Sequence, residues 1–157
     1  MAKTINQRMT VKMEGDFVVF LIGMRINRWW KFHRWIPVAL AMPKMLKELS
    51  NKPESGFLGA EVGLTTIVQY WKSFEHLEAY AKDRNGLHYP AWKDFNVKVK
   101  SNGDVGIWHE TFKVRQGEYE CIYNNMPKYG LGKVGELLTA NGRKESAGGR
   151  IAKQETV

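Results

Sequence analysis

The sequence predicts an α+β protein: a ferredoxin-like βαββαβ sandwich with an extra C-terminal strand, pairing with a second copy as a dimeric α/β barrel. Two observations lead to this prediction. Runs with the two-residue period of strands alternate with runs at helical spacing, in the order strand, helix, strand, strand, helix, strand. The first strand is also apolar on both faces, so helices can cover only one of them and a second copy is expected to cover the other.

A chain of 157 residues fits one domain. Residues 1–16 are polar and are expected to form a flexible N-terminal arm, in which residues 10–13 are a candidate for a short strand. Residues 17–139 hold the periodic segments and form the predicted dimeric α/β-barrel domain. Residues 140–157 lack aromatic side chains and are expected to be a disordered tail.

The first half of the predicted sandwich begins with a central strand at Phe17–Met24, a continuous apolar run. Apolar residues then follow helical spacing across residues 35–49. Pro37 fits the first turn of that helix. Pro43 is expected to kink or restart it, because the proline ring removes a backbone donor.

The second half starts with two strands, at residues 57–62 and 64–71, joined at Gly63. Ser73 can cap a helix that ends near Asp83, since its hydroxyl can accept from a free backbone N–H. A second short helix is expected from His88 or Tyr89 to Val97, followed by strands at residues 105–114 and 119–124.

Composition narrows the classes of function. The net charge of +8 suits an anionic partner but says nothing about the fold. Cys121 is the only cysteine, which excludes an intrachain disulfide and a Cys-rich metal site and favours a reducing cytoplasm. The polar N-terminus lacks the apolar core of a signal peptide, and no run reaches the roughly 18 apolar residues of a membrane span. A cytoplasmic location is therefore expected.

The segment from Arg25 to Trp35 carries three of the six tryptophans among four cations. It connects the central strand to the first helix. We expect it to form the rim of a pocket backed by the sheet, with Arg25 and Asn27 facing inward and Trp29 and Trp30 closing the mouth. The same aromatic and cationic composition is also typical of an anchor in a membrane interface.

Two histidines are candidates for chemistry. His88 shares a helix face with Trp92 and is placed to act as a general base or an axial haem ligand; the alternative is a partly exposed histidine at a helix start. Strand alternation puts His109 and Glu110 on opposite faces, so one of them is expected in a covered space. It would serve there as a pocket base or hydrogen-bond donor, or as the partner of Arg25 or Arg28.

Several blocks of the sequence resemble, in order, one bacterial and fungal domain family. The blocks are residues 24–37, 41–46, 56–59, 70–74, 88–92, 105–110 and 119–127. This family carries the label DUF4188 and is grouped with a fungal monooxygenase of fumagillin biosynthesis. The resemblance extends from about Phe17 to about Leu131.

The resemblance implies membership of the dimeric α/β-barrel superfamily. That superfamily includes cofactor-free antibiotic-biosynthesis monooxygenases, haem-degrading enzymes, chlorite dismutases and aldoxime dehydratases. It therefore implies a fold, a homodimer and a set of chemistries, but no residue-level mechanism.

Three hypotheses follow. The first is a cofactor-independent monooxygenase acting on an aromatic or polyketide-like substrate; the second is a haem-binding enzyme; the third is a non-catalytic module that binds a small hydrophobic ligand or weakly contacts a membrane surface. The sequence offers no phosphate-binding loop and no flavin, nicotinamide or specific nucleic-acid motif. The predicted catalytic residues are His88, His109 and Glu110, and the predicted substrate-binding residues are Arg25, Asn27, Trp29, Trp30, Tyr70, Trp92 and Trp108.

Overall fold

The computed structural model of the chain describes residues 3–98 and 103–151. Its main sheet has four antiparallel strands in the order β3-β4-β2-β5. The strands are β2 (Phe17–Ile26), β3 (Phe57–Val62), β4 (Thr66–Trp71) and β5 (Val105–Val114). β2 is central, as its apolar faces predict, and β5 lies at an edge of the sheet.

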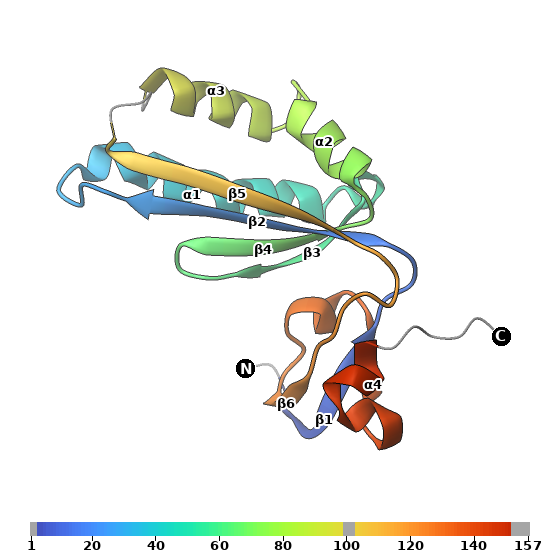
Figure 1. Cartoon of the computed structure of the whole chain (residues 1–157). Helices are drawn as coiled ribbons and strands as arrows, with labels where there is room; N and C mark the ends of the chain where they lie inside the picture. Colours follow the sequence, from blue (N-terminus) through green and yellow to red (C-terminus); the bar gives the residue numbers. More distant parts are fainter. Residues whose placement is uncertain (1–2, 99–102, 152–157) are drawn as a thin grey trace.

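Three helices lie on one face of the main sheet (Figure 1). They are α1 (Phe32–Ser50), α2 (Phe74–Lys82) and α3 (His88–Lys98). The element order and the strand order are compatible with a ferredoxin-like fold, so the prediction of a mixed α+β sandwich is confirmed. Pairing of two copies as a barrel stays a prediction.

The core under the helices joins both layers. Val18 of β2 and Trp71 of β4 pack against Leu49 of α1 and Leu77 of α2. The Trp71 side chain is fully buried, and its indole N–H donates to Gln69 Oε1 at 3.0 Å. A buried polar pair of this kind is stable because each group satisfies the other.

A second sheet covers one end of the opposite face of the main sheet (Figure 1). It contains β1 (Ile5–Lys12), β6 (Tyr123–Met126) and β7 (Glu136–Thr139), in the antiparallel order β6-β1-β7. Its apolar side joins the cluster of Val11, Met13 and Phe17. The expected N-terminal arm thus contains a strand, and the expected extra strand pairs with β1 instead of extending the main sheet.

The remaining elements are short. The 3₁₀ helices are η1 (Pro53–Ser55), η2 (Gly130–Lys133) and η3 (Gly142–Glu145), and α4 (Ala147–Ile151) ends the described chain. The tail was expected to be disordered, yet it contains the short helices η3 and α4, and the Arg150 guanidinium pairs with Glu120. The last part of that predicted tail, residues 152–157, lies outside the described residues.

The first helix begins earlier than predicted and continues through both of its prolines. α1 begins at Phe32 and continues to Ser50 with Pro37 and Pro43 inside it. Pro37 therefore lies beyond the first turn, and Pro43 does not restart the helix. The apolar contacts of Met45 and Leu49, both buried, hold the C-terminal half of α1 on the sheet despite the missing backbone donor.

Candidate functional site

A small cavity of about 40 Å³ lies between the main sheet and its three helices, and we call it the helix-side cavity. Its walls come from both layers and are mostly apolar. They are Phe20, Ile22, Met42, Met45, Leu49, Gln69, Leu77, Tyr80, Ala81 and His88. An apolar lining with a few polar groups is typical of small-molecule sites, but this cavity is far smaller than the usual few hundred Å³ of such a site.

His88 is the histidine in the wall of this cavity. It is half-buried at the start of α3, and its Nδ1 lies 3.1 Å from the carbonyl oxygen of Ala81. A carbonyl can only accept, so Nδ1 donates and Nε2 of the neutral ring carries the lone pair. The ring also packs against Tyr80, with centroids 5.8 Å apart. This arrangement gives His88 the form of a positioned base.

Glu48 of α1 connects the three helices behind His88. Its Oε2 accepts from Tyr80 Oη at 3.2 Å and from the backbone N–H of Leu87 at 3.1 Å. Its Oε1 accepts from Lys52 Nζ at 2.9 Å. Burial raises the pKa of Glu48, but these hydrogen bonds outweigh burial and hold the pKa below its usual value. Because Leu87 precedes His88, the carboxylate fixes the start of α3.

Tyr80 belongs to the same network, and its phenolic hydroxyl stays protonated at neutral pH. Burial raises its pKa well above the ordinary value, and the neighbouring Glu48 charge raises it further. Tyr80 is therefore a hydrogen-bond donor at neutral pH. Sequence analysis missed Glu48 and Tyr80, because the network joins residues 32 and 39 positions apart.

His109 lies next to the helix-side cavity, on β5. It pairs with Ile22 in the sheet register, and its ring lies 5.5 Å from that of Phe20. His109 is exposed, and so is Ile107 on the same face, with 43% of its surface accessible. The helices thus leave the β5 side of this face uncovered, which gives the cavity a side open to larger molecules.

The other face of the main sheet, away from the helices, is the open face. It carries Trp108, Glu110 and Phe112 of β5, which pair with residues of β2 on that face. Gly23 of β2 leaves room for the Trp108 indole, since a Cβ there would lie 2.6 Å from Trp108 Nε1. Trp108 is 39% and Phe112 49% exposed.

The predicted catalytic residues are therefore divided between two faces. His88 and His109 lie on the helix side, and Glu110 lies on the open face. Both His109 and Glu110 are exposed in the single chain, so neither is covered by the helices or by the second sheet. β5 is an edge strand of the main sheet. Whether a second copy covers Glu110 on the open face stays a prediction.

The basic connection before α1 is held by a carboxylate that sequence analysis did not select. Asp104, only 2% exposed, accepts from Arg28 Nη1 at 2.9 Å and from Lys31 Nζ at 3.0 Å. The Lys31 hydrogen bond holds the pKa of Asp104 below its usual value. Arg28 thus pairs with Asp104, and not with His109 or Glu110 as expected.

Most predicted substrate-binding residues are exposed. Arg25 and Asn27 reach solvent at the end of β2, and Trp29, Trp30 and Trp92 are 64%, 71% and 56% exposed. None of these five lines the helix-side cavity.

Tyr70 is the buried member of the predicted set. It lies at 8% exposure on the face that carries the second sheet, and a Cβ on Gly130 would lie 3.1 Å from its hydroxyl. Burial raises the pKa of Tyr70, and the charge of Glu61 adds to this. Glu61 itself accepts from Gly130 N at 3.1 Å and pairs with Lys133 Nζ at 2.6 Å. This polar group joins β3 of the main sheet to η2.

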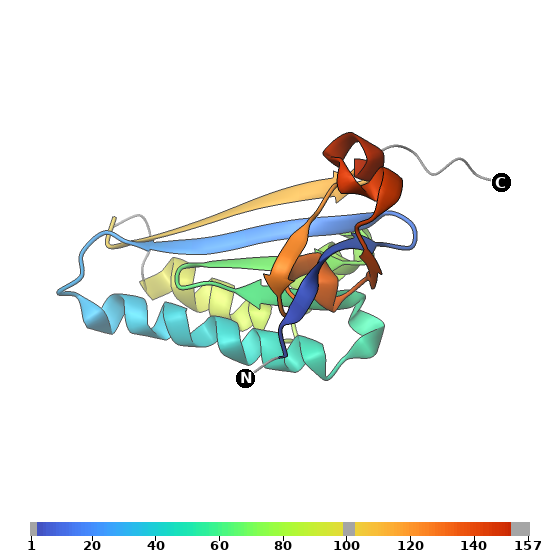
Figure 2. The same cartoon turned by 90° about the horizontal axis from the view of Figure 1, so that it is seen from below.

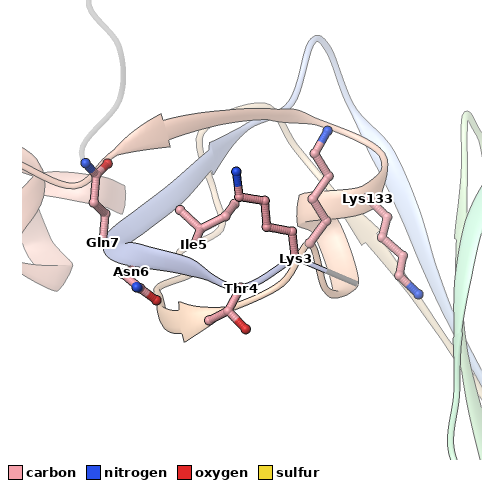
Figure 3. A pocket seen from close by; sticks show the side chains of 7 residues that line it. Lys3, Thr4, Ile5, Asn6, Gln7 and Lys133 are labelled. Carbon is pink, nitrogen blue, oxygen red and sulfur yellow. The ribbon is translucent and has the colours of Figure 1, made fainter. Parts of the chain in front are cut away.

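A larger, open hollow of about 890 Å³ lies along the start of β1. Its lining is Lys3, Thr4, Ile5, Asn6, Gln7, Lys128 and Lys133. The polar ends of the labelled side chains point in different directions in Figure 3 and do not converge on one position. This hollow contains none of the predicted site residues, and its geometry defines no binding site.

Residues 3–98 and 103–151 lack two features that mark other classes of protein. Within those ranges, no three His, Cys, Asp or Glu side chains gather as a metal site would require. No helix of the described chain has both the length and the apolar character needed to cross a bilayer.

The fold and the cavity define a small α+β protein with a histidine in the wall of an apolar hollow. The chain belongs to the Monooxygenase af470-like family, whose model matches residues 17–131. This range runs from β2 through the first residues of η2 and contains every residue of the helix-side cavity. The match agrees with the family resemblance of the sequence blocks.

One curated relative is Monooxygenase af470 of the fungus Aspergillus fumigatus. The two proteins are 31% identical over 153 residues, which covers 84% of this chain. The same alignment covers 50% of the relative, so the chain spans about half the length of the fungal protein.

Proposed function

We propose that the chain is a monooxygenase that needs no bound cofactor and acts on an electron-rich aromatic or polyketide-like substrate. Membership of the Monooxygenase af470-like family supports the reaction class. The observation that carries the site is the position of His88, with its Nδ1 held by a backbone carbonyl in the wall of an apolar cavity.

The proposed reaction uses the substrate itself as the reductant. His88 takes a proton from an acidic C–H or O–H of the substrate, and the resulting carbanion or phenolate is electron-rich enough to reduce O₂. One oxygen atom forms a C–O bond, and the other leaves as water with two hydrogens from the substrate. The substrate is oxidised by this exchange, and no external electron donor is required.

The uncovered β5 side explains how such a substrate reaches the base. The helix-side cavity has room for a few water molecules and not for an aromatic ring system. Ile107 and His109 lie exposed beside it, next to Phe20. In this proposal the substrate lies along the uncovered β5 side of the helix face, with His109 at the outer end as a hydrogen-bond donor and His88 at the inner end.

Oxygen uptake with an anthrone-like and a catechol-like substrate tests the proposal. Wild-type protein should consume O₂, and His88→Ala should lower the rate about 10²- to 10⁴-fold, the usual contribution of a general base. His33→Ala is the matched control, because His33 is exposed on α1 and lines neither hollow. Equal rates for His88→Ala and wild type would remove His88 from the mechanism.

The haem hypothesis makes a different demand on the same site. A haem needs far more space than the cavity's volume of about 40 Å³, although the Nδ1 hydrogen bond to Ala81 O leaves Nε2 of His88 as the atom that could ligate iron. The volume of the cavity, and not the chemistry of His88, therefore argues against a haem. A Soret band in the purified protein that disappears in His88→Ala or His109→Ala would reverse this conclusion and favour the haem alternative.

We also propose that a second copy covers the free part of the open face. The second sheet covers one end of that face, while Trp108 and Phe112 stay partly exposed. Apolar side chains in the middle of a sheet are a common site of association between copies. This proposal keeps the dimeric α/β barrel that the sequence predicts.

A further inference from the structure

The helix α1 is apolar on two sides. Its inner side carries the buried Met45 and Leu49. Phe32, Ile36 and Leu40 follow one another at four-residue spacing on its outer side, with 61%, 38% and 57% of their surfaces exposed. A surface helix normally has a single apolar stripe that faces the core, so this second stripe has no role in folding.

Two tryptophans extend the outer stripe beyond the start of α1. Trp29 and Trp30 are more than 60% exposed, and Trp35 Nε1 donates to the Trp29 carbonyl at 3.1 Å. The rings of Trp29 and Trp35 are 5.9 Å apart in an edge-to-face arrangement. This contact holds the loop against the helix. We call Trp29, Trp30, Phe32, Ile36 and Leu40 together the tryptophan face.

The segment that contains the tryptophan face carries side-chain charges of one sign. Residues 17–47 contain six cations and no acidic residue. The cations are Arg25, Arg28, Lys31, Arg34, Lys44 and Lys47. Asp104 pairs with two of them, Arg28 and Lys31, from the start of β5. Lys44 and Lys47 are exposed, one and two turns beyond Leu40, so the surface stays positive.

We propose that the tryptophan face binds the surface of an anionic lipid bilayer, whatever reaction the chain catalyses. Tryptophan rings are suited to the headgroup level, aliphatic side chains to the acyl boundary below it, and lysines to anionic headgroups. Bases of a nucleic acid stack on aromatic rings, but stacking does not involve aliphatic side chains such as Ile36 and Leu40. The helix side also lies opposite the open face, so a second copy on that face leaves α1 accessible (Figure 2).

Sedimentation with vesicles tests this proposal on the full chain. Vesicles of phosphatidylcholine mixed with phosphatidylglycerol should retain the protein, and vesicles of phosphatidylcholine alone should not. Added salt should weaken the binding, and tryptophan emission should shift to shorter wavelength as the rings leave water. Each lysine removed should lower the partition coefficient about fivefold, so the Lys44→Ala, Lys47→Ala pair should lower it about 25-fold.

Variants with matched controls locate the surface. Trp29→Ala with Trp30→Ala, and separately Leu40→Ser, should each reduce binding strongly. Leu64→Ser and Lys72→Ala should bind as wild type does, because Leu64 is fully exposed in the β3–β4 turn and Lys72 is exposed after β4. All these positions are at the surface, and circular dichroism should show the same fold in every variant.

Three results would overturn the proposal. The first is no retention by anionic vesicles at low salt, and the second is an equal loss in Leu40→Ser and Leu64→Ser. The third is binding to a different partner through the same residues. If light scattering shows an oligomer that Leu40→Ser dissociates, the partner is a second copy. If the protein binds duplex DNA but not vesicles, and Trp29→Ala with Trp30→Ala abolishes the DNA binding, the partner is a nucleic acid.

Discussion

Glu48 is the side chain on which the position of His88 most depends. One carboxylate accepts from Tyr80, Leu87 and Lys52, which belong to or adjoin all three helices. Its removal leaves the N–H of Leu87 and the hydroxyl of Tyr80 without their acceptor. The base of the proposed site is therefore held by a residue that does not itself line the cavity.

We expect Glu48→Gln to lower the free energy of unfolding by about 1–3 kcal/mol at neutral pH, the usual cost of leaving buried partners of a charged group unsatisfied. The folded-state pKa of Glu48 lies below its ordinary value of 4.5. A lowered pKa stabilises the fold above the unfolded-state value, and this stability is lost as pH falls through the lowered pKa. The difference between variant and wild type should thus disappear in acid, as followed by urea unfolding.

Glu78→Gln is the control for this measurement. Glu78 pairs with Lys82 at 2.9 Å, but both side chains are largely exposed, so this pair contributes at most about 0.5 kcal/mol. A similar loss in both variants, or a loss in Glu48→Gln that persists in acid, would show that the network does not stabilise the fold as described.

Single residues also show where sequence reasoning succeeds. Strand alternation correctly placed His109 and Glu110 on opposite faces, because the two-residue period is a property of the backbone. Whether a face is covered depends on the neighbouring elements, and the sequence near His109 contains no signal for that. The same limit explains why Asp104, in a turn, was not expected to be buried beneath Arg28.

At the scale of elements, α1 carries a conflict between its sequence and its conformation. Pro43 lies in the interior of the helix and supplies no N–H to the carbonyl one turn earlier. The helix nevertheless continues, because its inner side is packed on the sheet. The local pattern correctly predicted the helix and its buried side. Tertiary packing, which that pattern does not contain, keeps the helix continuous at Pro43.

Pro43→Ala should therefore raise the free energy of unfolding by about 1–3 kcal/mol, less than the full difference in helix propensity because proline also restricts the unfolded chain. Urea unfolding measures this. Pro90→Ala is the control, since Pro90 lies in the first turn of α3, where the backbone N–H has no intrahelical acceptor. No gain in Pro43→Ala, or an equal gain in both variants, would contradict this account of α1.

Among the strands, β1 was the least predictable. Five of its eight residues are polar, and only two, Thr10 and Val11, are buried, so no apolar alternation marks the strand. It exists because β6 and β7 supply hydrogen-bonding partners on both sides. Such pairing joins residues more than 100 positions apart, and no local period records it.

For the whole molecule, the open face decides the state of association. We expect light scattering to give a homodimer, since Trp108 and Phe112 would otherwise stay in water. Phe112→Glu should give a monomer by placing a charge in the interface. Thr111→Glu should remain a dimer, because Thr111 pairs with Phe20 on the helix side of the same strand. A wild-type monomer at micromolar concentration would contradict the barrel arrangement.

The sequence predicted the main sandwich well, because residues 17–114 form it from consecutive segments with clear periods. It did not predict the second sheet, whose strands are short and come from both ends of the chain. Of the polar groups in and behind the wall of the helix-side cavity, the sequence pointed only to His88. The others are brought together by packing between distant segments.

The second sheet has a consequence for the order of folding. All strands and helices of the main layer lie within residues 17–114, whereas Ile5 pairs with Met126 and Met9 with Thr139. Contacts between distant residues form slowly, because closing a long loop costs entropy before any contact is gained. During synthesis β1 is made before β6 and β7, so it has no strand partner until residues 123–139 have followed it. The surface that β1 finally covers, around Phe17, is therefore the last part of the core to leave water.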